Sequence, residues 1–450
     1  MEGIANREES GYYSESRVVC DRNEGTEPIM KNARILFTTL GSLGDLYPYL
    51  ALAVEMQRRG HRATILTSSQ HRARIERCGV RFHQIEPDLD FTDPVFQKRA
   101  MREMTGGRYM LRDVMLPRIR PNYENLLAAA ASADLLVTQM LSYAGPLVAE
   151  KTGMPWVSTV LAPLAFFSYQ DSPVLSSRLN GIREKAPWIN ARINRVARST
   201  TQSWNEPVYE LRRELGLSAV PEPVYDGQHS PARVLAMFSP LLAQAQSDWP
   251  PQTRITGFSF YEEPVNSAKD VSSALDEFLA AGPAPVVFTL GSYAVMNPGK
   301  FYEESVDAVR RLGVRAVMLD GRGGDGTRVT PDILSVSYAP HSYLFPRASV
   351  IVHSGGIGTC ARAMRAGRPM LVVPFAHDQP DNALRLVRLG VARTLGSKSY
   401  TARRAATEIA LLLDESRYRS NTERIARIVE SENGASAACD ALENCLRGAN

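Results

Sequence analysis

Two short stretches of the sequence carry residue types that bind phosphates and sugars. The first is a glycine turn, residues 355–359 (GGIGT), which follows an apolar run at 348–352 and precedes a segment with helical spacing. Glycines let the backbone approach a ligand closely, and the first amides of a helix attract anions. The turn therefore suits a pyrophosphate, although a ligand-free strand-to-helix turn has the same composition.

The second stretch lies about twenty residues later, directly after another apolar run. It contains Asp378, Gln379 and Asn382 within the segment VVPFAHDQPDNA. One carboxylate and two amides offer the donors and acceptors needed to bind several hydroxyls of a sugar. A solvated loop in which these residues cap a helix is the alternative interpretation.

Two common nucleotide-binding motifs are absent. The first turn, GSLGD at 41–45, is not GxGxxG, and the second apolar run ends in LTSSQ without the acid that would hold a ribose hydroxyl. Cys360 and Ala361 follow Thr359, where a Walker A motif would place its lysine. These features argue against a nicotinamide-dependent dehydrogenase and against a P-loop enzyme.

The elements that would position these residues alternate between strands and helices. The segment 33–41 is an apolar, β-rich run, 45–60 has helical spacing and ends at a glycine, and 61–69 is a second apolar run. This order is a βαβ unit, which requires a parallel sheet. Further strands are expected at 133–139, 155–163, 233–239, 252–258, 284–292, 314–321, 335–341, 348–356 and 368–375.

The pattern restarts after a polar stretch, which predicts two Rossmann-like α/β domains with parallel sheets facing across a cleft. We expect a disordered tail at 1–29, where seven acids and three arginines give a net charge of −4. An N-terminal domain at 30–258, a linker at 259–283, a C-terminal domain at 284–420 and terminal helices at 421–450 complete the division. Ligands of such sheets bind at the carboxyl ends of the strands.

The composition excludes several classes of protein. The chain has 450 residues and a formal net charge of +4, too small and dispersed for a nucleic-acid surface. It has no run of 18 apolar residues, and from its polar N-terminus we expect no signal peptide. The five cysteines lack metal or disulfide spacing, which favours reduced thiols and a cytoplasmic protein: Cys20, Cys78, Cys360, Cys439 and Cys445.

The ordered set of motifs resembles glycosyltransferase family 1, the nucleotide-sugar-dependent enzymes of GT-B fold. The resemblance spans 31–415 and rests on GSLGDLYPYLALAVEMQRRGH at 41–61, YAPH at 338–341, HSGGIGT at 353–359, Gly367 with Pro369, and Pro374 with DQ at 378–379. Bacterial members that act on lipids, sterols or natural products are the most similar. The resemblance implies an inverting transferase that moves a sugar from a UDP- or dTDP-sugar to a hydroxyl of a hydrophobic small molecule, without a further cofactor.

The resemblance also implies roles for the donor-binding residues. Tyr338 would stack on the nucleotide base, and Ser292 and Thr359 would contact the phosphates with the backbone of Gly355, Gly356 and Gly358. Asp378 and Gln379 would bind the donor sugar, assisted by Asn382. The family's histidine before the glycines falls on His353 or Ser354, according to the alignment. Arg362 occupies the usual Glu or Gln position, which leaves the ribose contact and the nucleoside open.

Asp45 falls where the family places its catalytic base, and the competing role is to cap the helix at 46–59. His61 is interpreted as structural. Tyr143, Phe166 and Phe167 would line an apolar acceptor pocket, or belong to the core. Asp88-Leu89-Asp90 has the look of a metal motif but lies in the other half, so no metal is expected.

Two alternatives remain: a nucleotide-sugar epimerase of similar architecture, and a catalytically degenerate nucleotide-sugar-binding protein. A lipid-like acceptor would also allow a peripheral membrane contact. The sequence leaves the acceptor, the sugar and the oligomeric state open.

Overall fold

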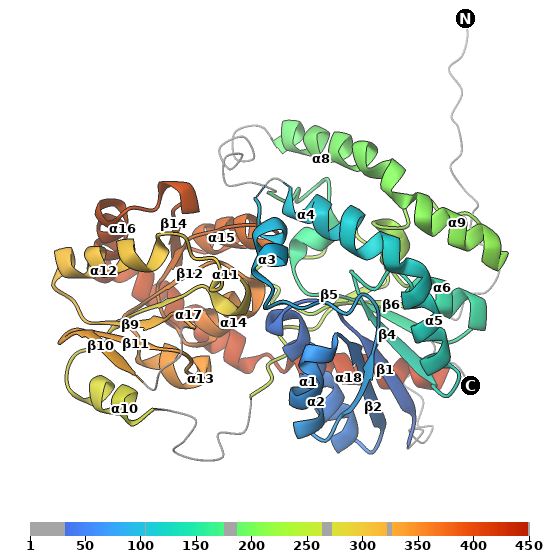
Figure 1. Cartoon of the computed structure of the whole chain (residues 1–450), viewed down its shortest axis with the longest axis horizontal. Coiled ribbons are helices and arrows are strands. Elements are labelled where there is room, and N and C mark those ends of the chain that lie inside the picture. Colours follow the sequence, from blue (N-terminus) through green and yellow to red (C-terminus); the bar gives the residue numbers. More distant parts are fainter. Residues whose placement is uncertain (1–31, 104, 175–186, 263–271, 322–325, 449–450) are drawn as a thin grey trace, which may run out of the picture.

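The computed structural model describes residues 32–103, 105–174, 187–262, 272–321 and 326–448, which form two α/β domains (Figure 1). The tail expected at 1–29 and the central part of the expected linker, 263–271, lie outside the described residues. Each domain has one sheet with helices against it, as the alternating pattern predicts. Each sheet has seven strands, where the sequence predicted six in the first domain and five in the second.

The N-terminal sheet has the strand order β3-β2-β1-β4-β5-β6-β7, and all its neighbouring strands pair in parallel. The chain leaves β1 at the middle of the sheet, builds outward to β3, and then returns to β4 on the other side of β1. The switch therefore lies between β1 and β4, where a doubly wound sheet opens a crevice. The strands are β1 Arg34–Thr38, β2 Arg62–Thr67, β3 Arg81–Gln84, β4 Leu135–Gln139, β5 Trp156–Val160, β6 Arg233–Ala236 and β7 Thr253–Ile255.

The C-terminal sheet has the order β10-β11-β9-β8-β12-β13-β14. Its pairs are parallel except at one edge, where β10 runs antiparallel to β11 and corrects the expectation of a purely parallel sheet. Only two residues separate β10 from β11, and so short a connection can join only antiparallel strands. The strands are β8 Val286–Thr289, β9 Ala316–Leu319, β10 Thr327–Thr330, β11 Ile333–Val336, β12 Val350–His353, β13 Met370–Val372 and β14 Ala392–Thr394.

Helices pack on both sheets, while α8 lies along the rim of the molecule. In the N-terminal domain they are α1 Leu43–Arg58, α2 Arg72–Arg77, α3 Pro94–Ala100, α4 Gly106–Arg108, α5 Ile119–Ala130, α6 Gly145–Thr152, α8 Pro187–Thr201 and α9 Glu206–Leu215. The later helices are α10 Ser273–Ala280, α11 Gly291–Ala294, α12 Phe301–Leu312, α13 His341–Leu344, α14 Ile357–Arg365, α15 Gln379–Arg388, α16 Ala402–Asp414, α17 Ser416–Ser431 and α18 Gly434–Gly448.

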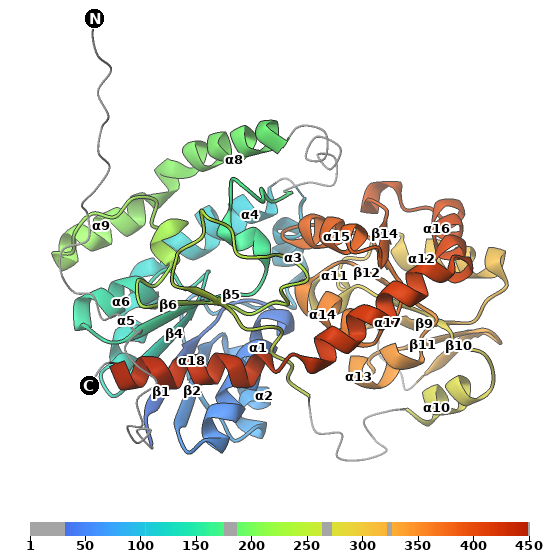
Figure 2. The same cartoon turned by 180° about the vertical axis from the view of Figure 1, so that it is seen from behind.

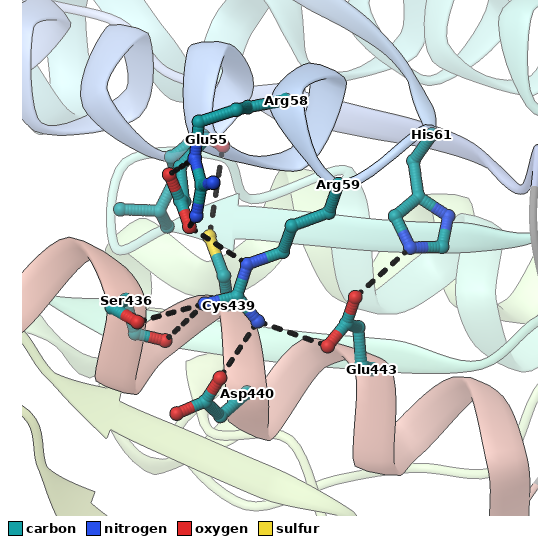
Figure 3. Close-up of polar contacts among 9 residues, drawn as sticks. Glu55, Arg58, Arg59, His61, Ser436, Cys439, Asp440 and Glu443 are labelled. Atoms are coloured by element: carbon teal, nitrogen blue, oxygen red, sulfur yellow. Dashed lines mark hydrogen bonds and ion pairs between the residues drawn. The ribbon is translucent and has the colours of Figure 1, made fainter. Parts of the chain in front are cut away.

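The last two helices join the domains. Figure 2 shows α17 on the C-terminal domain and α18 lying across the N-terminal domain, where Leu442 and Leu446 are buried with the apolar face of α1. Polar contacts hold α18 on the N-terminal domain (Figure 3). Arg59 donates to Asp440 at 2.7 Å and to Glu443 at 2.9 Å. The buried His61 places Nε2 3.2 Å from Glu443, a structural position in agreement with its interpretation from the sequence.

A second connection between the domains is a buried ion cluster around Arg385 of α15. Its guanidinium pairs with Asp381 at 2.7 Å on the same helix and with Asp171 of the N-terminal domain. The other oxygen of Asp381 accepts from the amide of Val174 at 3.0 Å, and Arg385 also donates to the carbonyl of Leu242. Helix α15 is thereby docked onto the segment 171–174 of the opposite domain.

Candidate active site

The first turns of α1 and α14 meet where the two domains face each other. A Cβ built on Gly358 would lie 3.7 Å from the Cα of Gly44, so two glycines form this contact between the helices. Both helices begin directly after a strand, at the carboxyl edge of its sheet. The positive ends of two helix dipoles are thus brought together, and negative charge is stabilised between them.

Asp45 lies in the first turn of α1, partly buried at this meeting point. Its Oδ2 accepts from the amide of Ser42 at 2.8 Å, while the hydroxyl of Ser42 accepts from the amide of Gly44 at 3.2 Å. This reciprocal arrangement is a capping box, so the alternative role foreseen from the sequence is real. Capping does not exclude proton transfer, because the carboxylate has a second oxygen.

The second oxygen of Asp45 is held by Gln139, a residue that the sequence analysis did not single out. Gln139 ends β4, the neighbour of β1, and donates from Nε2 to Oδ1 of Asp45 at 2.7 Å. Its own Oε1 accepts from the amide of Leu40 at 2.8 Å and from the hydroxyl of Thr39 at 3.0 Å. These bonds fix which end of the amide faces Asp45. In the sequence, Gln139 could have been recognised as a polar residue that ends a buried strand beside the predicted crevice.

The electrostatics of the site favour a carboxyl group that exchanges protons near neutrality. Burial raises the pKa of Asp45 to about 6, although hydrogen bonds from Ser42 and Gln139 oppose the rise. Burial also raises the pKa of Asp378 to about 6, and the nearby charge of Asp45 adds to this effect. The domains therefore bring together two carboxyl groups that influence each other's ionisation.

The glycine turn has the geometry that a close approach of backbone and ligand requires. Gly355 has a φ of 91°, and a Cβ there would lie 2.8 Å from Val372 and 3.2 Å from the carbonyl oxygen of Gln379. No atom lies within 4 Å of a Cβ built on Gly356, the residue that caps α14 without a side chain. The approach to the N-terminus of α14 is thus unobstructed at Gly356, while the amide of Ile357 is already bonded to Asp378.

The two residues before the glycines have different environments. Ser354 is buried and donates its hydroxyl to the carbonyl of Leu290 at 3.0 Å, which ties the turn to the end of β8. His353 is fully buried, and its Nδ1 accepts from the amide of Gly355 at 3.1 Å. The neutral ring therefore carries its proton on Nε2, which has no partner in the part of the chain described. Burial lowers the pKa of His353 to about 3.

The polar loop predicted to bind the sugar is connected to the glycine turn by Asn382. This buried amide donates to the carbonyl of Gly355 at 3.0 Å and to Asp378 at 2.6 Å. Asp378 also accepts from the backbone of Ile357 at the start of α14. Gln379 is buried, with Oε1 accepting from the amides of Phe375 and Ala376 at 2.8 and 3.1 Å. Asn382 and Gln379 thus shape the loop, while Asp378 faces α14.

The other predicted donor-binding residues come from several elements. Ser292 in α11 is exposed, and the Oγ1 of Thr359 lies 3.5 Å from a Cβ built on the adjacent Gly291. Tyr338 follows β11, and 56% of its surface is exposed. The start of α11, the glycine turn and Asp378 therefore lie together at the N-terminus of α14.

Arg362 is engaged with the end of the N-terminal domain. It lies 2.9 Å from the carboxylate of Glu262 and donates to the carbonyl of Tyr261. The sequence has an arginine where the family usually has an acid or amide, and the fold brings a carboxylate, Glu262, to that arginine. Burial, followed by the charge of Arg362, lowers the pKa of the nearby His341 to about 3.

The aromatic residues proposed for the acceptor pocket differ in exposure. Phe166 is buried against Trp249, with ring centroids 3.9 Å apart, and Tyr143 is also buried. These two rings pack in the core, the competing interpretation given above. Phe167 is partly exposed and packs edge-on against Tyr225. Of the three, Phe167 has surface to offer an acceptor.

The described residues contain no cluster of three or more His, Cys, Asp or Glu side chains that could hold a metal ion. Asp88 accepts from the amide of Ser69 in the segment after β2, and Asp90 accepts from Thr92 in its own loop, so both acids have local structural contacts. Within the same described ranges, no helix is long and apolar enough to cross a membrane.

Two Rossmann-like domains whose sheets face each other form the GT-B fold of glycosyltransferases. Solved structures share the fold: the glycosyltransferase of kitacinnamycin has a TM-score of 0.69 at 20% identity, covering 93% of this chain and 100% of its own. Glycosyltransferase VinC in complex with dTDP has a TM-score of 0.63 at 19% identity, covering 92% and 100%.

The family follows from sequence comparison. Residues 35–165 match the glycosyltransferase family 28 N-terminal domain, and 304–441 match the erythromycin biosynthesis protein CIII-like C-terminal domain. O-mycaminosyltylonolide 6-deoxyallosyltransferase of Streptomyces fradiae is 30% identical over 429 residues, covering 91% of this chain and 97% of its own. The chain therefore belongs to the same family of GT-B glycosyltransferases as this relative.

A more distant relative is larger. Sterol 3-beta-glucosyltransferase UGT80A2 of Arabidopsis thaliana is 26% identical over 425 residues, covering 91% of this chain. The alignment covers 65% of the length of that relative, just under two thirds.

Proposed function

We propose that this glycosyltransferase moves a sugar, with inversion, from a nucleoside diphosphate sugar to a hydroxyl of a hydrophobic small molecule. The observation that carries the proposal is Asp45, a partly buried carboxylate held by Ser42 and Gln139 where α1 meets the N-terminus of α14. A proton acceptor and an anion site on facing domains are the two parts that a direct displacement requires.

The donor would bind to the C-terminal domain. Its diphosphate would lie against the first amides of α14, beside Gly356, Ser292 and Thr359, with the base on Tyr338. Asp378 would accept hydrogen bonds from the sugar hydroxyls. Because Asn382 holds both Asp378 and the carbonyl of Gly355, the proposed sugar and phosphate contacts would keep a constant separation. His353, which is fully buried, would support the glycine turn from behind by accepting from the amide of Gly355.

In the reaction, the acceptor oxygen would attack the anomeric carbon while the bond from that carbon to the diphosphate oxygen breaks. The hydroxyl proton would pass to Asp45, and the electron pair of the broken bond would stay with the nucleoside diphosphate, stabilised by the α14 dipole. One displacement from the face opposite the leaving group inverts the anomeric centre. A pKa near 6 leaves Asp45 ionised at neutral pH and more basic than an ordinary aspartate.

The substrate classes are supported by the relatives. The names of two of them specify a tylonolide derivative and sterols as acceptors, and a solved neighbour holds dTDP. Partly exposed Phe167 offers an apolar contact in the N-terminal domain. A UDP- or dTDP-sugar and a hydroxylated apolar acceptor are therefore the substrates to test first.

The decisive experiment measures nucleoside diphosphate release and product mass with UDP- and dTDP-sugars, in the presence and absence of sterol and macrolide acceptors. Asp45→Asn should lower kcat by about 10²–10⁴-fold, because it removes the base. Nucleotide affinity should persist, since the phosphate site is on the other domain. Asp90→Asn, in an exposed loop, is the control.

Each alternative has its own signature. Full turnover by Asp45→Asn would contradict the base assignment. An isomerised nucleotide sugar formed without acceptor would indicate an epimerase, and nucleotide binding without turnover of any donor would indicate a degenerate binding protein.

A further inference from the structure

Helix α8 has an outward face on which aromatic, aliphatic and cationic side chains lie together. Trp188 and Val196 are each 63% exposed, and Arg192 and Arg195 are exposed between them. With Ser199, these residues follow each other at spacings of three, four and one, so they form one stripe of the helix. The guanidinium of Arg192 lies 5.8 Å from the centre of the Trp188 ring.

The opposite face of α8 is anchored to the N-terminal domain. Arg198 is buried, pairs with Glu222 and Asp226, and lies 4.9 Å over the ring of Tyr225. Thr201 places its hydroxyl 2.8 Å from that of Tyr225. These contacts set the rotation of the helix, so the exposure of Trp188 and Val196 is a consequence of fixed packing.

The positive charge of α8 favours a negatively charged partner surface. The segment 187–201 contains three arginines and no acid. The next helix, α9, has the opposite character, with Glu206, Glu210 and Glu214 exposed along one side. Figures 1 and 2 both show α8 along the rim of the molecule, on the far side from α2 and α18.

We propose that the stripe Trp188–Arg192–Arg195–Val196 of α8 docks on an anionic lipid bilayer. A helix that combines a large aromatic, an aliphatic residue and arginines lies in the interface of a bilayer, with arginines at the phosphates and Trp at the headgroup boundary. A purely polyanionic partner would use the arginines but would leave Trp188 and Val196 in water. Docking goes beyond sugar transfer, and it would bring the acceptor domain to the phase in which apolar acceptors dissolve.

The test is sedimentation of the full chain with vesicles, which needs no substrate and is independent of transferase activity. Binding should be strong to phosphatidylglycerol-rich vesicles, weak to phosphatidylcholine vesicles, and lowered by salt. Arg192→Glu with Arg195→Glu should lower the affinity about tenfold or more, because each arginine near an anionic surface contributes about 1 kcal/mol. Trp188→Ser with Val196→Ser should lower it as well.

A matched control reverses two exposed arginines elsewhere: Arg424→Glu with Arg427→Glu on α17 should leave vesicle binding unchanged. All variants alter exposed side chains, and thermal unfolding checks that each is folded. Equal binding to neutral and anionic vesicles, no binding to either, or equal loss in the α17 control would overturn the proposal. A further outcome would also overturn it. If Trp188→Ser with Val196→Ser left vesicle binding unchanged and the variant still bound heparin, the partner of the stripe would be a soluble polyanion.

Discussion

Gln139 donates a hydrogen bond to Asp45 across the switch point of the N-terminal sheet, with Nε2 2.7 Å from Oδ1. Because the amide of Leu40 and the hydroxyl of Thr39 occupy the oxygen of Gln139, its nitrogen is the group that faces the carboxylate. Asp45 is thus oriented by β4 while it caps α1.

This relationship predicts the effect of Gln139→Leu. The substitution removes a donor to ionised Asp45, so the pKa of Asp45 should rise and the acid limb of the kcat/KM profile should move to higher pH. We expect kcat to fall about ten- to a hundredfold through misplacement of the carboxylate, with the KM for the nucleotide sugar unchanged. The loss of buried hydrogen bonds should cost about 1–3 kcal/mol of unfolding free energy.

The pH profile of kcat/KM distinguishes a role of Gln139 in orienting Asp45 from a role in stability alone. Thr39→Val removes only the hydroxyl that binds Gln139 and should leave the acid limb in place. An unchanged acid limb in Gln139→Leu would show that Gln139 acts only on stability.

The paired carboxyl groups predict a pH dependence. With the pKa of Asp45 raised to about 6, kcat/KM should increase as pH rises through 6 and then level off. Asp378→Asn removes a neighbouring negative charge, so the acid limb of its residual activity should shift to lower pH. A wild-type profile that is flat between about pH 5 and 8 would contradict a base with this pKa.

Asp45 and Asp378 should lower the unfolding free energy as pH rises, whereas an ion-paired acid raises it. Between the ordinary value of 3.8 and about 6, the folded chain holds protons on Asp45 and Asp378 that the unfolded chain has lost. Their contribution to the unfolding free energy therefore falls as pH rises through this window. Chemical unfolding of wild type, Asp45→Asn and Asp378→Asn at several pH values measures this contribution.

Two adjacent glycines should respond differently to alanine. Gly355→Ala places a methyl group 2.8 Å from Val372 at a φ of 91°, and we expect a loss of about 2–4 kcal/mol in unfolding free energy. Gly356→Ala meets no atom within 4 Å, so it should cost no more than about 1 kcal/mol, through the weaker N-cap of α14.

Nucleotide binding then tests the anion site directly. Calorimetric titration with UDP and dTDP should show weaker binding to Gly356→Ala, because its methyl group would stand where the phosphates approach. Unaltered affinity in that variant would place the phosphates elsewhere.

The ion cluster between the domains predicts a large stability effect at one arginine and a small effect at its neighbour. Arg385→Leu leaves Asp381, which is fully buried, without its cation, and should cost about 3–5 kcal/mol. Arg388 is 41% exposed and 4.0 Å from Asp171, so Arg388→Gln should cost less than about 1 kcal/mol. Urea unfolding followed by fluorescence measures both, and equal effects would show that the cluster does not hold the domains together.

The local elements and the family could be predicted from the sequence. Apolar runs ending in glycine and the helical spacing between them determine two α/β domains, because secondary structure follows from patterns within a few residues. The glycine turn and the polar loop after it were recognisable for the same reason. Strands β3, β10 and β14 were missed, because each has only three or four residues and few of these are buried.

Contacts between distant residues were decided by the tertiary structure. Gln139 and Asp45 are 94 residues apart and meet because β4 pairs with β1, while Arg385 and Asp171 are 214 residues apart and meet across the domains. The same holds for Glu262, which reaches Arg362 from the segment that follows β7, 100 residues earlier in the chain. Composition places Tyr143 and Phe166 equally well in a pocket or in the core, and only packing buries them. Sequence thus specified the chemical groups and their strands, whereas strand order and domain contact decided which groups act on one another.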